Sequence, residues 1–578
     1  MRTTLIAIAS VPVLALALPG CGGDRPERSR PPDTVTIIEL ADISKPMPLI
    51  SETSLDSEVS SIMYRPLLAS RWEDGELHYL TADEDERSLA RGYEFTGPDR
   101  ASLRYRMRSD ARWSDGTPVT SHDAVWTMET RGDPRAASPR QAYNRQIRAF
   151  EVEDDSTFVI HFTRPYPEML FHSAGQVAPR HLYADHDPSQ LRSHPAVNSP
   201  GGGSLVVSGP YMVGEWLRGQ RLVLVPNPEY HPQPTIPRIV FLPIPEETTR
   251  MIELQTGNAD VMDLPFDKID LIRTGSPEVR FETRRRRFYD YIAYNPRTHP
   301  AFEDASVRRA LGLAIDVPAI LAALQLGPWA EPAGGPYAPI FRLLYDPAEQ
   351  APLPFDPDEA ARLLDAAGWI PGPDGIRVRD GQPLRFTLST NAGNQRRSDA
   401  SQIIQQQWRR VGIDARLQTL ETNTFFDRLN SREFEASMAG WGVGLSADMS
   451  DMWTGDRPFN LTSFSDPEVD RLFDLALGQP TEEEAAMYWR EAAGRIVAAQ
   501  PYTWLFYFDQ VVGVNDRIRN TRIDTLGSYQ NIHEWWIVGG AGDPDRADPT
   551  TADPDLLSDA GGSAGFAGQT NGGNGQDP

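Results

Sequence analysis

Segments with the pattern of strands and of helices alternate along most of the 578-residue chain. Runs rich in β-branched residues predict strands at 34–40, 221–225 and 238–244, and alternation of apolar and polar residues predicts one at 102–108. Apolar residues at helical spacing predict helices at 121–130, 246–257, 356–368 and 398–412. Asp356 is the expected N-cap of one helix, and Gly368 is expected to end it. Mixed elements in a chain too long for a single core predict an α/β fold with several lobes.

The charge of the chain excludes several classes of function. The formal net charge is −25, which argues against nucleic acid or an anionic membrane surface as the main partner. Lys45 and Lys268 are the only lysines, and the other 54 of the 56 basic residues are arginines. Neither lysine follows a glycine, so the chain has no phosphate-binding loop of the Gly-Lys type.

The N-terminus has the pattern of a bacterial lipoprotein signal. Arg2 precedes an apolar run from Leu5 to Leu18, which is too short to span a bilayer easily, and Cys21 follows Gly20 as in a lipobox. We expect residues 1–20 to be a signal peptide, Cys21 to be lipidated and residues 21–33 to be a flexible tether. The chain would then be anchored to a bacterial membrane in the cell envelope, in the periplasm or on the outer face. The alternative is an ordinary signal peptide beside an unrelated cysteine.

Two further features concern the composition of the whole chain. Because Cys21 is the only cysteine, intramolecular disulfides and zinc sites with two thiolates are excluded. Residues 539–578 are rich in Gly, Asp, Pro and Ala, and they predict a disordered acidic tail.

Five segments, in the same order, resemble the peptide/nickel-type family of extracellular solute-binding proteins, family 5. They read DARWSDGTPVTSHDAVWTME (110–129), SGPYMVGEWLRGQRLVLVPNPEYH (208–231), YNPRTHPAFEDASVRRALGLAID (294–316), DEAARLLDAAGW (358–369) and QQWRRVGIDARLQ (406–418). The resemblance extends over roughly residues 34–538. Most of these residues have a structural explanation; Asp304, for example, is expected to cap a helix at 305–315.

The resemblance implies a periplasmic-binding-protein-like fold of the cluster C type, a two-lobed clamp with an extra inserted domain and two hinge strands. By the order of the motifs, lobe I comprises 34–60, 176–290 and 503–538, the inserted domain comprises 61–175, and lobe III comprises 291–502. The hinge strands are expected near Phe288–Asn295 and near Pro501–Phe508. Such a clamp binds its ligand between the lobes and closes on it.

Three segments are the expected walls of the ligand site. The first contains Ser54 and Leu55, at the place where family members carry a loop beside the ligand. The second is a polar loop that contains Asn391. The third contains Trp441 and Gly442, where a flat aromatic side chain and a glycine would both allow close contact with a ligand.

The third segment departs from peptide-binding relatives, in which an aspartate shortly after the Gly-Trp pair binds the ammonium group of the peptide. The corresponding residue here is Gly444, and the nearest acids are Asp448 and Asp451. Either Asp448 takes the role after a shift of the loop, or the protein does not bind free peptide N-termini. The arginine run 284–287 could attract an acidic ligand, although such a run is more often a solvated strand face.

The resemblance implies a substrate-binding lipoprotein of an ABC importer, which captures a peptide or other small solute and delivers it to permease and ATPase subunits. We expect a monomer with no cofactor, no metal and no nucleic-acid partner. Residues 34–538 contain no His-Glu-x-x-His or Gly-x-Ser-x-Gly motif, so we expect no enzyme activity. Two alternatives remain open: a ligand sensor with the same fold but without a transporter, and a secreted hydrolase with distant carboxylates.

Overall fold

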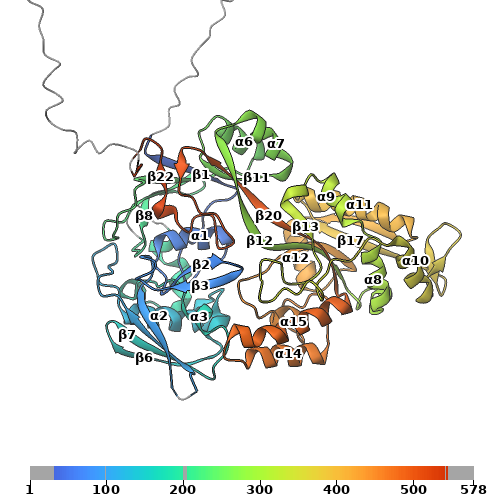
Figure 1. Cartoon of the computed structure of the whole chain (residues 1–578), viewed down its shortest axis with the longest axis horizontal. Coiled ribbons are helices and arrows are strands. Elements are labelled where there is room, and N and C mark those ends of the chain that lie inside the picture. The colour runs from blue at the N-terminus through green and yellow to red at the C-terminus, as the bar shows by residue number, and fades with distance from the viewer. Residues whose placement is uncertain (1–31, 98, 199–204, 541, 545–578) are drawn as a thin grey trace, which may run out of the picture.

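The computed structural model describes residues 32–97, 99–198, 205–540 and 542–544 (Figure 1). The predicted signal peptide, the lipidation site Cys21 and nearly all of the predicted tail therefore lie outside the described residues. No helix in these ranges is long and apolar enough to span a membrane.

An eleven-stranded mixed sheet runs through the molecule. Ten strands follow one another across it and an eleventh, β13 (Ala330–Pro332), pairs with β20. The order of the ten is β18 (Asp414–Leu420), β17 (Arg385–Asn391), β19 (Ala436–Gly442), β12 (Val279–Tyr294), β20 (Tyr502–Asn515), β11 (Val261–Leu264), β1 (Thr34–Glu39), β10 (Arg238–Pro243), β9 (Arg221–Pro226) and β8 (Tyr211–Leu217).

The two longest strands, β12 and β20, connect the two halves of this sheet (Figure 1). Residues 279–285 of β12 pair with the part of β20 that also pairs with β11, and β11 continues into the lobe I strands. Residues 288–294 of β12 pair with β19 of lobe III. The pairing of β12 with β20 shifts register between Arg285 and Tyr289, where the chain passes from one half to the other.

The inserted domain has small sheets of its own, at the lower left of Figure 1. One has the order β4 (Ala90–Thr96), β5 (Ser102–Met107), β7 (Thr157–Phe162), β6 (Ile147–Asp154), and the other pairs β2 (Ala69–Glu73) with β3 (Glu76–Leu80). The remaining strands are β14 (Ile370–Pro371), β15 (Arg377–Arg379), β16 (Gln382–Pro383), β21 (Ile518–Arg519) and β22 (Trp536–Ile537).

Helices pack on the sheets of both lobes and of the inserted domain. They are α1 (Ser54–Met63), α2 (Ser121–Gly132), α3 (Met169–Ser173), α4 (Arg180–Tyr183), α5 (Pro195–Asn198), α6 (Glu247–Gln255), α7 (Ile269–Gly275), α8 (Ala305–Leu313), α9 (Val317–Ala323), α10 (Pro357–Ala366), α11 (Gln395–Arg410), α12 (Thr422–Asn430), α13 (Ser450–Trp453), α14 (Pro467–Leu477) and α15 (Glu482–Ala499).

The capping residues account for most of these boundaries. Asp356 accepts a hydrogen bond from the backbone N–H of Glu359 at 2.8 Å, as predicted, and Asp304 caps α8 in the same way. Gly368 has a φ of 82°, the left-handed conformation that ends a helix without cost for glycine. Helix α11 begins three residues before the predicted start at 398, because Asn394 accepts from the N–H of Arg397 at 3.0 Å.

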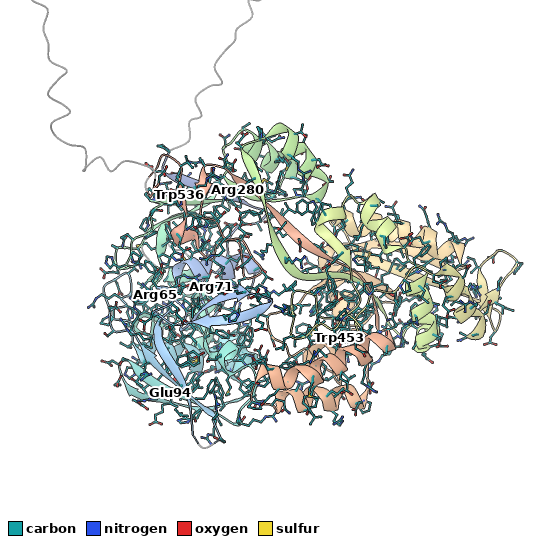
Figure 2. The ribbon with its side chains drawn as sticks, viewed as in Figure 1. Arg65, Arg71, Glu94, Arg280, Trp453 and Trp536 are labelled. Atoms are coloured by element: carbon teal, nitrogen blue, oxygen red, sulfur yellow. The ribbon has the colours of Figure 1, made fainter. Side chains whose placement is uncertain are left out.

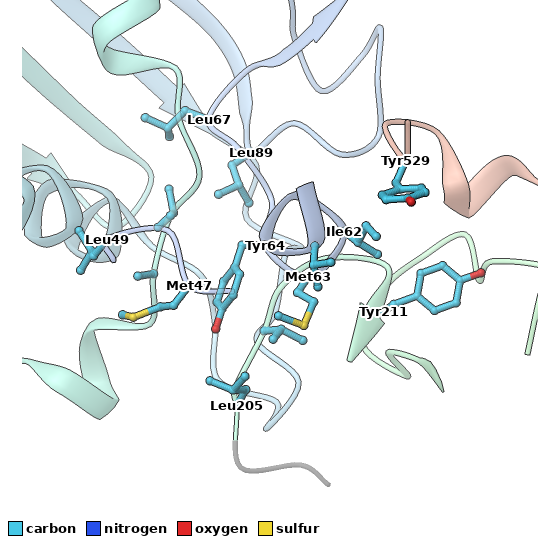
Figure 3. Packing of buried hydrophobic residues seen from close by; sticks show 14 of the residues in the cluster. Met47, Leu49, Ile62, Met63, Tyr64, Leu67, Leu89, Leu205, Tyr211 and Tyr529 are labelled. Carbon is cyan, nitrogen blue, oxygen red and sulfur yellow. The ribbon is translucent and has the colours of Figure 1, made fainter. Parts of the chain in front are cut away.

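The buried apolar side chains form clusters that follow the lobes. The first cluster joins lobe I to the inserted domain, and Figure 3 shows part of it, including Met47 and Tyr211 from lobe I and Leu67 and Leu89 from the inserted domain. Two other clusters fill lobe III, one of which contains Trp453 (Figure 2). The predicted fold class, an α/β two-lobed clamp, is thus confirmed. The exact domain boundaries stay a prediction.

Candidate ligand site

A cavity of about 430 Å³ lies where lobe I, the inserted domain and lobe III meet. Lobe I contributes Pro48 and Leu49, the inserted domain contributes most of the wall, and lobe III contributes Gly444 and Leu445. Its volume is within the range of small-molecule sites. A solute here would contact both sides of the clamp, so binding and closure would be coupled.

The lining of this cavity is strongly basic. It includes Arg87, Arg131, Arg140 and Arg287, and it includes no aspartate or glutamate. This is the reverse of the whole chain, in which acidic residues outnumber basic ones by 81 to 56. The cavity therefore carries a local positive charge on an acidic protein.

Only one of the four arginines has a carboxylate partner among the described residues. Arg87 forms an ion pair with Asp85 at 2.7 Å. Arg140 donates to the backbone oxygen of Pro48 at 3.4 Å and to Ser57 Oγ at 3.0 Å, and both acceptors are uncharged. Arg131 donates from Nε to Asn144 Oδ1 at 2.7 Å, while its Nη2 is buried without a hydrogen-bond partner.

Arg287 comes from a different part of the fold. It lies on β12 where the register shifts against β20, and its guanidinium makes no hydrogen bond or ion pair with the part of the chain that the structure describes. Arg284, three residues earlier in the same run, is paired with Glu58 at 2.7 Å. The run 284–287 is thus not uniformly a solvated face, since it supplies one ion pair and one cavity-lining arginine.

Burial lowers the pKa of Arg131 and of Arg287 to about 10 each. A second positive charge also lowers each value: Arg140 acts on Arg131, and Arg284 acts on Arg287. Both guanidinium groups are still charged at neutral pH. The fold therefore holds one buried and one part-buried cation close to other cations.

Aromatic side chains complete this wall of the site. The Arg131 guanidinium lies 5.6 Å from the centre of the Tyr143 ring, and Tyr143 stacks on His172 with 4.6 Å between ring centres. The hydroxyl of Tyr79 is buried without a hydrogen-bond partner. Because a buried phenol normally finds a partner, this hydroxyl is available to a polar group of a ligand.

The structure places Ser54 and Leu55 at the start of α1 rather than in a loop. Ser54 is exposed, and Leu55 packs against the core that lobe I shares with the inserted domain. The buried carboxylate of Asp56 accepts from the backbone N–H groups of Ser44 at 2.7 Å and Lys45 at 3.1 Å. This segment positions the wall near Pro48 without providing a side chain from Ser54 or Leu55 to it.

Asn391 belongs to a buried polar network of lobe III. Its Oδ1 accepts from Arg397 Nη1 at 3.0 Å, and Arg397 Nε pairs with Asp290 at 3.1 Å. Arg396 pairs with the same carboxylate at 2.9 Å. A Cβ at Gly440 would clash with Arg397 and would lie 2.6 Å from Asp290, which explains the glycine before the tryptophan.

The remaining predicted residues lie beside the cavity segment. Trp441 is part-buried and contacts Phe459 edge-on, with 5.4 Å between ring centres. Gly442 is exposed, and Asp448 accepts from the N–H and the Oγ of Ser450 at 2.9 and 3.0 Å. None of the six predicted site residues is among those that line the cavity, whereas Gly444 and Leu445 from the same segment are. Their role in binding stays a prediction.

Two other features are weaker candidates for the site. A cavity of about 590 Å³ is lined by residues of β11, β20 and α11, and by acids such as Asp263, Asp267 and Asp509. Among the described residues, one group brings three possible metal ligands together: Glu86, His533 and Glu534. His533 and Glu86 are 3.2 Å apart, and Glu534 pairs with Arg522 at 2.8 Å, so these groups satisfy one another as ion pairs.

Sequence reasoning missed Arg131 and Arg140. Each is one of many arginines in a lysine-poor chain, and nothing in the local pattern separates them from surface arginines. The only part of the basic lining that the sequence indicates is the arginine run 284–287, which contains Arg287. An acidic ligand is one of the two interpretations of that run.

The family model of bacterial extracellular solute-binding proteins, family 5, matches residues 64–462. The chain belongs to this family. The predicted resemblance is thereby confirmed, together with the class of substrate-binding proteins of ABC transporters that the family represents.

Several family members are similar over most of their length. The oligopeptide-binding protein AppA of Bacillus subtilis is 22% identical over 558 residues, which cover 93% of this chain and 99% of that protein. The structure of AppA in complex with a nonapeptide matches with a TM-score of 0.72, at 20% identity, over 87% of this chain and 98% of that one. The periplasmic EDTA-binding protein EppA matches with a TM-score of 0.76, at 22% identity, over 87% and 96% of the two chains.

Proposed function

We propose that this protein is the substrate-binding lipoprotein of an ABC importer. It captures a peptide or peptide-like solute between its lobes and delivers the solute unchanged to a membrane permease. The lipid anchor holds it at the membrane, and it acts as a monomer.

The position of the basic cavity is the observation that supports this proposal most directly. Residues of lobe I, the inserted domain and lobe III all line it, so a bound solute adds contacts that only the closed clamp can make. A ligand can shift a conformational equilibrium only through such differential contacts. Delivery then requires only that a permease open the clamp.

The relatives indicate the range of solutes rather than one solute. AppA was solved with a nonapeptide, and EppA is described as an EDTA-binding protein. The same fold therefore accommodates solutes that differ widely in size and charge. For this chain, the class of ligand has to be inferred from the residues that line its own cavity.

Lipid anchoring is expected to depend on Cys21. Cys21→Ser should leave the precursor unprocessed at this site or release a soluble product, because a diacylated cysteine buries many CH₂ groups at about 0.8 kcal/mol each. Fractionation of cells that express both forms measures the effect. Unchanged association of the serine variant with membranes would contradict the lipoprotein assignment.

Ligand binding is expected to close the clamp. Small-angle scattering should give a smaller radius of gyration with the solute than without it, since β12 and β20 are the strands that join the two halves of the sheet. Mass spectrometry of the solute released by denaturation should recover it intact. Chemical conversion of the bound molecule would place the protein among enzymes instead.

A further inference from the structure

The cationic lining of the cavity is incomplete without a counter-charge. Three of its four arginines, Arg131, Arg140 and Arg287, lack a carboxylate partner among the described residues. Arg131 is only 8% exposed, and its Nη2 has no acceptor. Burying an unpaired charge costs free energy, and neighbouring like charges add to that cost.

The nearby acids do not supply this counter-charge. Glu168 approaches the Tyr143 wall, but its Oε1 accepts from the N–H of Ala447 at 2.8 Å, and burial raises its pKa to about 8. Glu168 is therefore mostly uncharged at neutral pH. Asp448 is occupied by Ser450, and Asp451 lies 3.4 Å from Arg145, which is not a lining residue.

The three arginines are positioned by different parts of the fold. Arg131 is in the last turn of α2, Arg140 is tied to the lobe I atoms Pro48 O and Ser57 Oγ, and Arg287 is on β12 at the register shift. All three act electrostatically on Tyr143, and each of them lowers the pKa of this phenol against the effect of burial. They therefore converge on one region of the cavity.

The described lining of the cavity also has no carboxylate that could pair with a free ammonium. Gly444 lines the wall and provides no carboxylate, at the place where the family resemblance implies an ammonium-binding aspartate in peptide-binding relatives. There is space for a side chain there, since the nearest atom to a Cβ at Gly444 is the backbone nitrogen of Ser446, at 3.8 Å. A carboxylate at this position is sterically possible but absent.

We infer that the solute carries two or more carboxylate groups close together and binds them to Arg131, Arg140 and Arg287, without recognition of a free ammonium group. Guanidinium groups bind carboxylates through paired, charge-assisted hydrogen bonds, which suits this cluster. The inference rests on the proposed function, because it names the class of solute for that same site. An acidic peptide and a non-peptide polycarboxylate share this chemistry.

Calorimetric titration of the whole protein, after removal of any co-purified solute, tests the inference with three probes. Citrate represents the non-peptide polycarboxylates, tri-aspartate the acidic peptides, and tri-alanine a neutral peptide. Citrate or tri-aspartate should bind, and whichever binds more tightly identifies the source of the carboxylates. Tri-alanine should bind at least roughly 30-fold more weakly.

Two variants connect this binding to the cavity. Arg287→Gln should lower the affinity for the anionic probe by roughly 30-fold or more, because the substitution removes a charged partner of the carboxylates. Gly444→Asp should abolish the same binding, because its carboxylate would pair with the arginines in place of the ligand. Arg148→Gln is the matched control: Arg148 is exposed on β6 of the inserted domain and lines none of the cavities described above. It should bind like the unmodified protein.

The inference would be overturned if neither anionic probe bound or if tri-alanine bound as tightly as the anionic probes. It would also be overturned if both cavity variants bound the anionic probe as tightly as the unmodified protein. Thermal melting of each variant separates loss of binding from loss of folding. Native mass spectrometry of the freshly purified protein tests the proposed function separately. A neutral or cationic solute that closes the clamp would preserve the proposed function and refute this inference, whereas a clamp that never binds or closes would refute the proposed function.

Discussion

Asp290→Asn is expected to lower the free energy of unfolding of lobe III by about 3–5 kcal/mol. Asp290 is fully buried on β12, and its carboxylate pairs with Arg396 at 2.9 Å and with Arg397 at 3.1 Å. The amide would leave two guanidinium groups, one of them almost fully buried, without a counter-charge. Scanning calorimetry of the purified protein should show an earlier thermal transition.

Asp427→Asn provides a matched control for this change. Asp427 is an exposed residue of α12 in the same lobe, and the same removal of one negative charge there should shift the transition very little. If the Asp290→Asn protein had the same transition temperature as the Asp427→Asn control, the Asp290–Arg396–Arg397 network would contribute little to stability. Such a result would also remove the structural explanation for Asn391 and Gly440.

Glu168→Gln is expected to remove the contribution of this one carboxyl to the pH dependence of stability between pH 5 and 8. Burial is the main cause that raises the pKa of Glu168 from an ordinary 4.5 to about 8, and the nearby Asp448 and Glu482 raise it further. The folded protein therefore holds a proton that the unfolded chain loses above pH 4.5. The contribution of this proton to the free energy of unfolding is complete below that pH. About 3–4 kcal/mol of this contribution is lost as the pH rises from 5 to 8.

The glutamine variant carries no such proton, so its unfolding free energy should fall less with pH and should exceed that of the unmodified protein at pH 8. Because Glu168 of the inserted domain accepts from Ala447 of lobe III, the effect should appear in the contact between these two parts. Denaturation at several pH values measures it. Glu129→Gln, an exposed change on α2, is the control. Parallel pH profiles for the unmodified protein and Glu168→Gln would refute the prediction.

Local sequence rules were sufficient for most elements. The strand patterns at 34–40, 102–108, 221–225 and 238–244 correspond to β1, β5, β9 and β10 within one residue. Helix ends were predictable where a capping side chain or a glycine fixes them within a few residues, as at Asp356 and Gly368. The start of α11 was not, because Asn394 and Ser398 are both acceptable N-caps and only the three-dimensional contacts choose between them.

The family and the class of fold followed from five ordered segments. The glycines, prolines and capping residues in these segments specify the scaffold through their spacing along the chain. The lining of the candidate cavity did not follow from them. The six predicted site residues belong to three conspicuous segments, whereas the cavity is lined by Gly444 and Leu445 of one segment and by arginines that no motif marks. Conspicuous side chains such as Trp441 and Asn391 instead support lobe III.

Composition determined that this protein is acidic, and capping residues and family motifs, which act over a few residues, determined that it is an α/β clamp. Tertiary structure alone decided which arginines face the cavity. Arg284 and Arg287 are three residues apart in one run, yet the first meets Glu58 across 226 positions of sequence and the second meets no carboxylate among the described residues. The charge that a ligand encounters is the sum of such long-range pairings, and these exist only once the chain has folded.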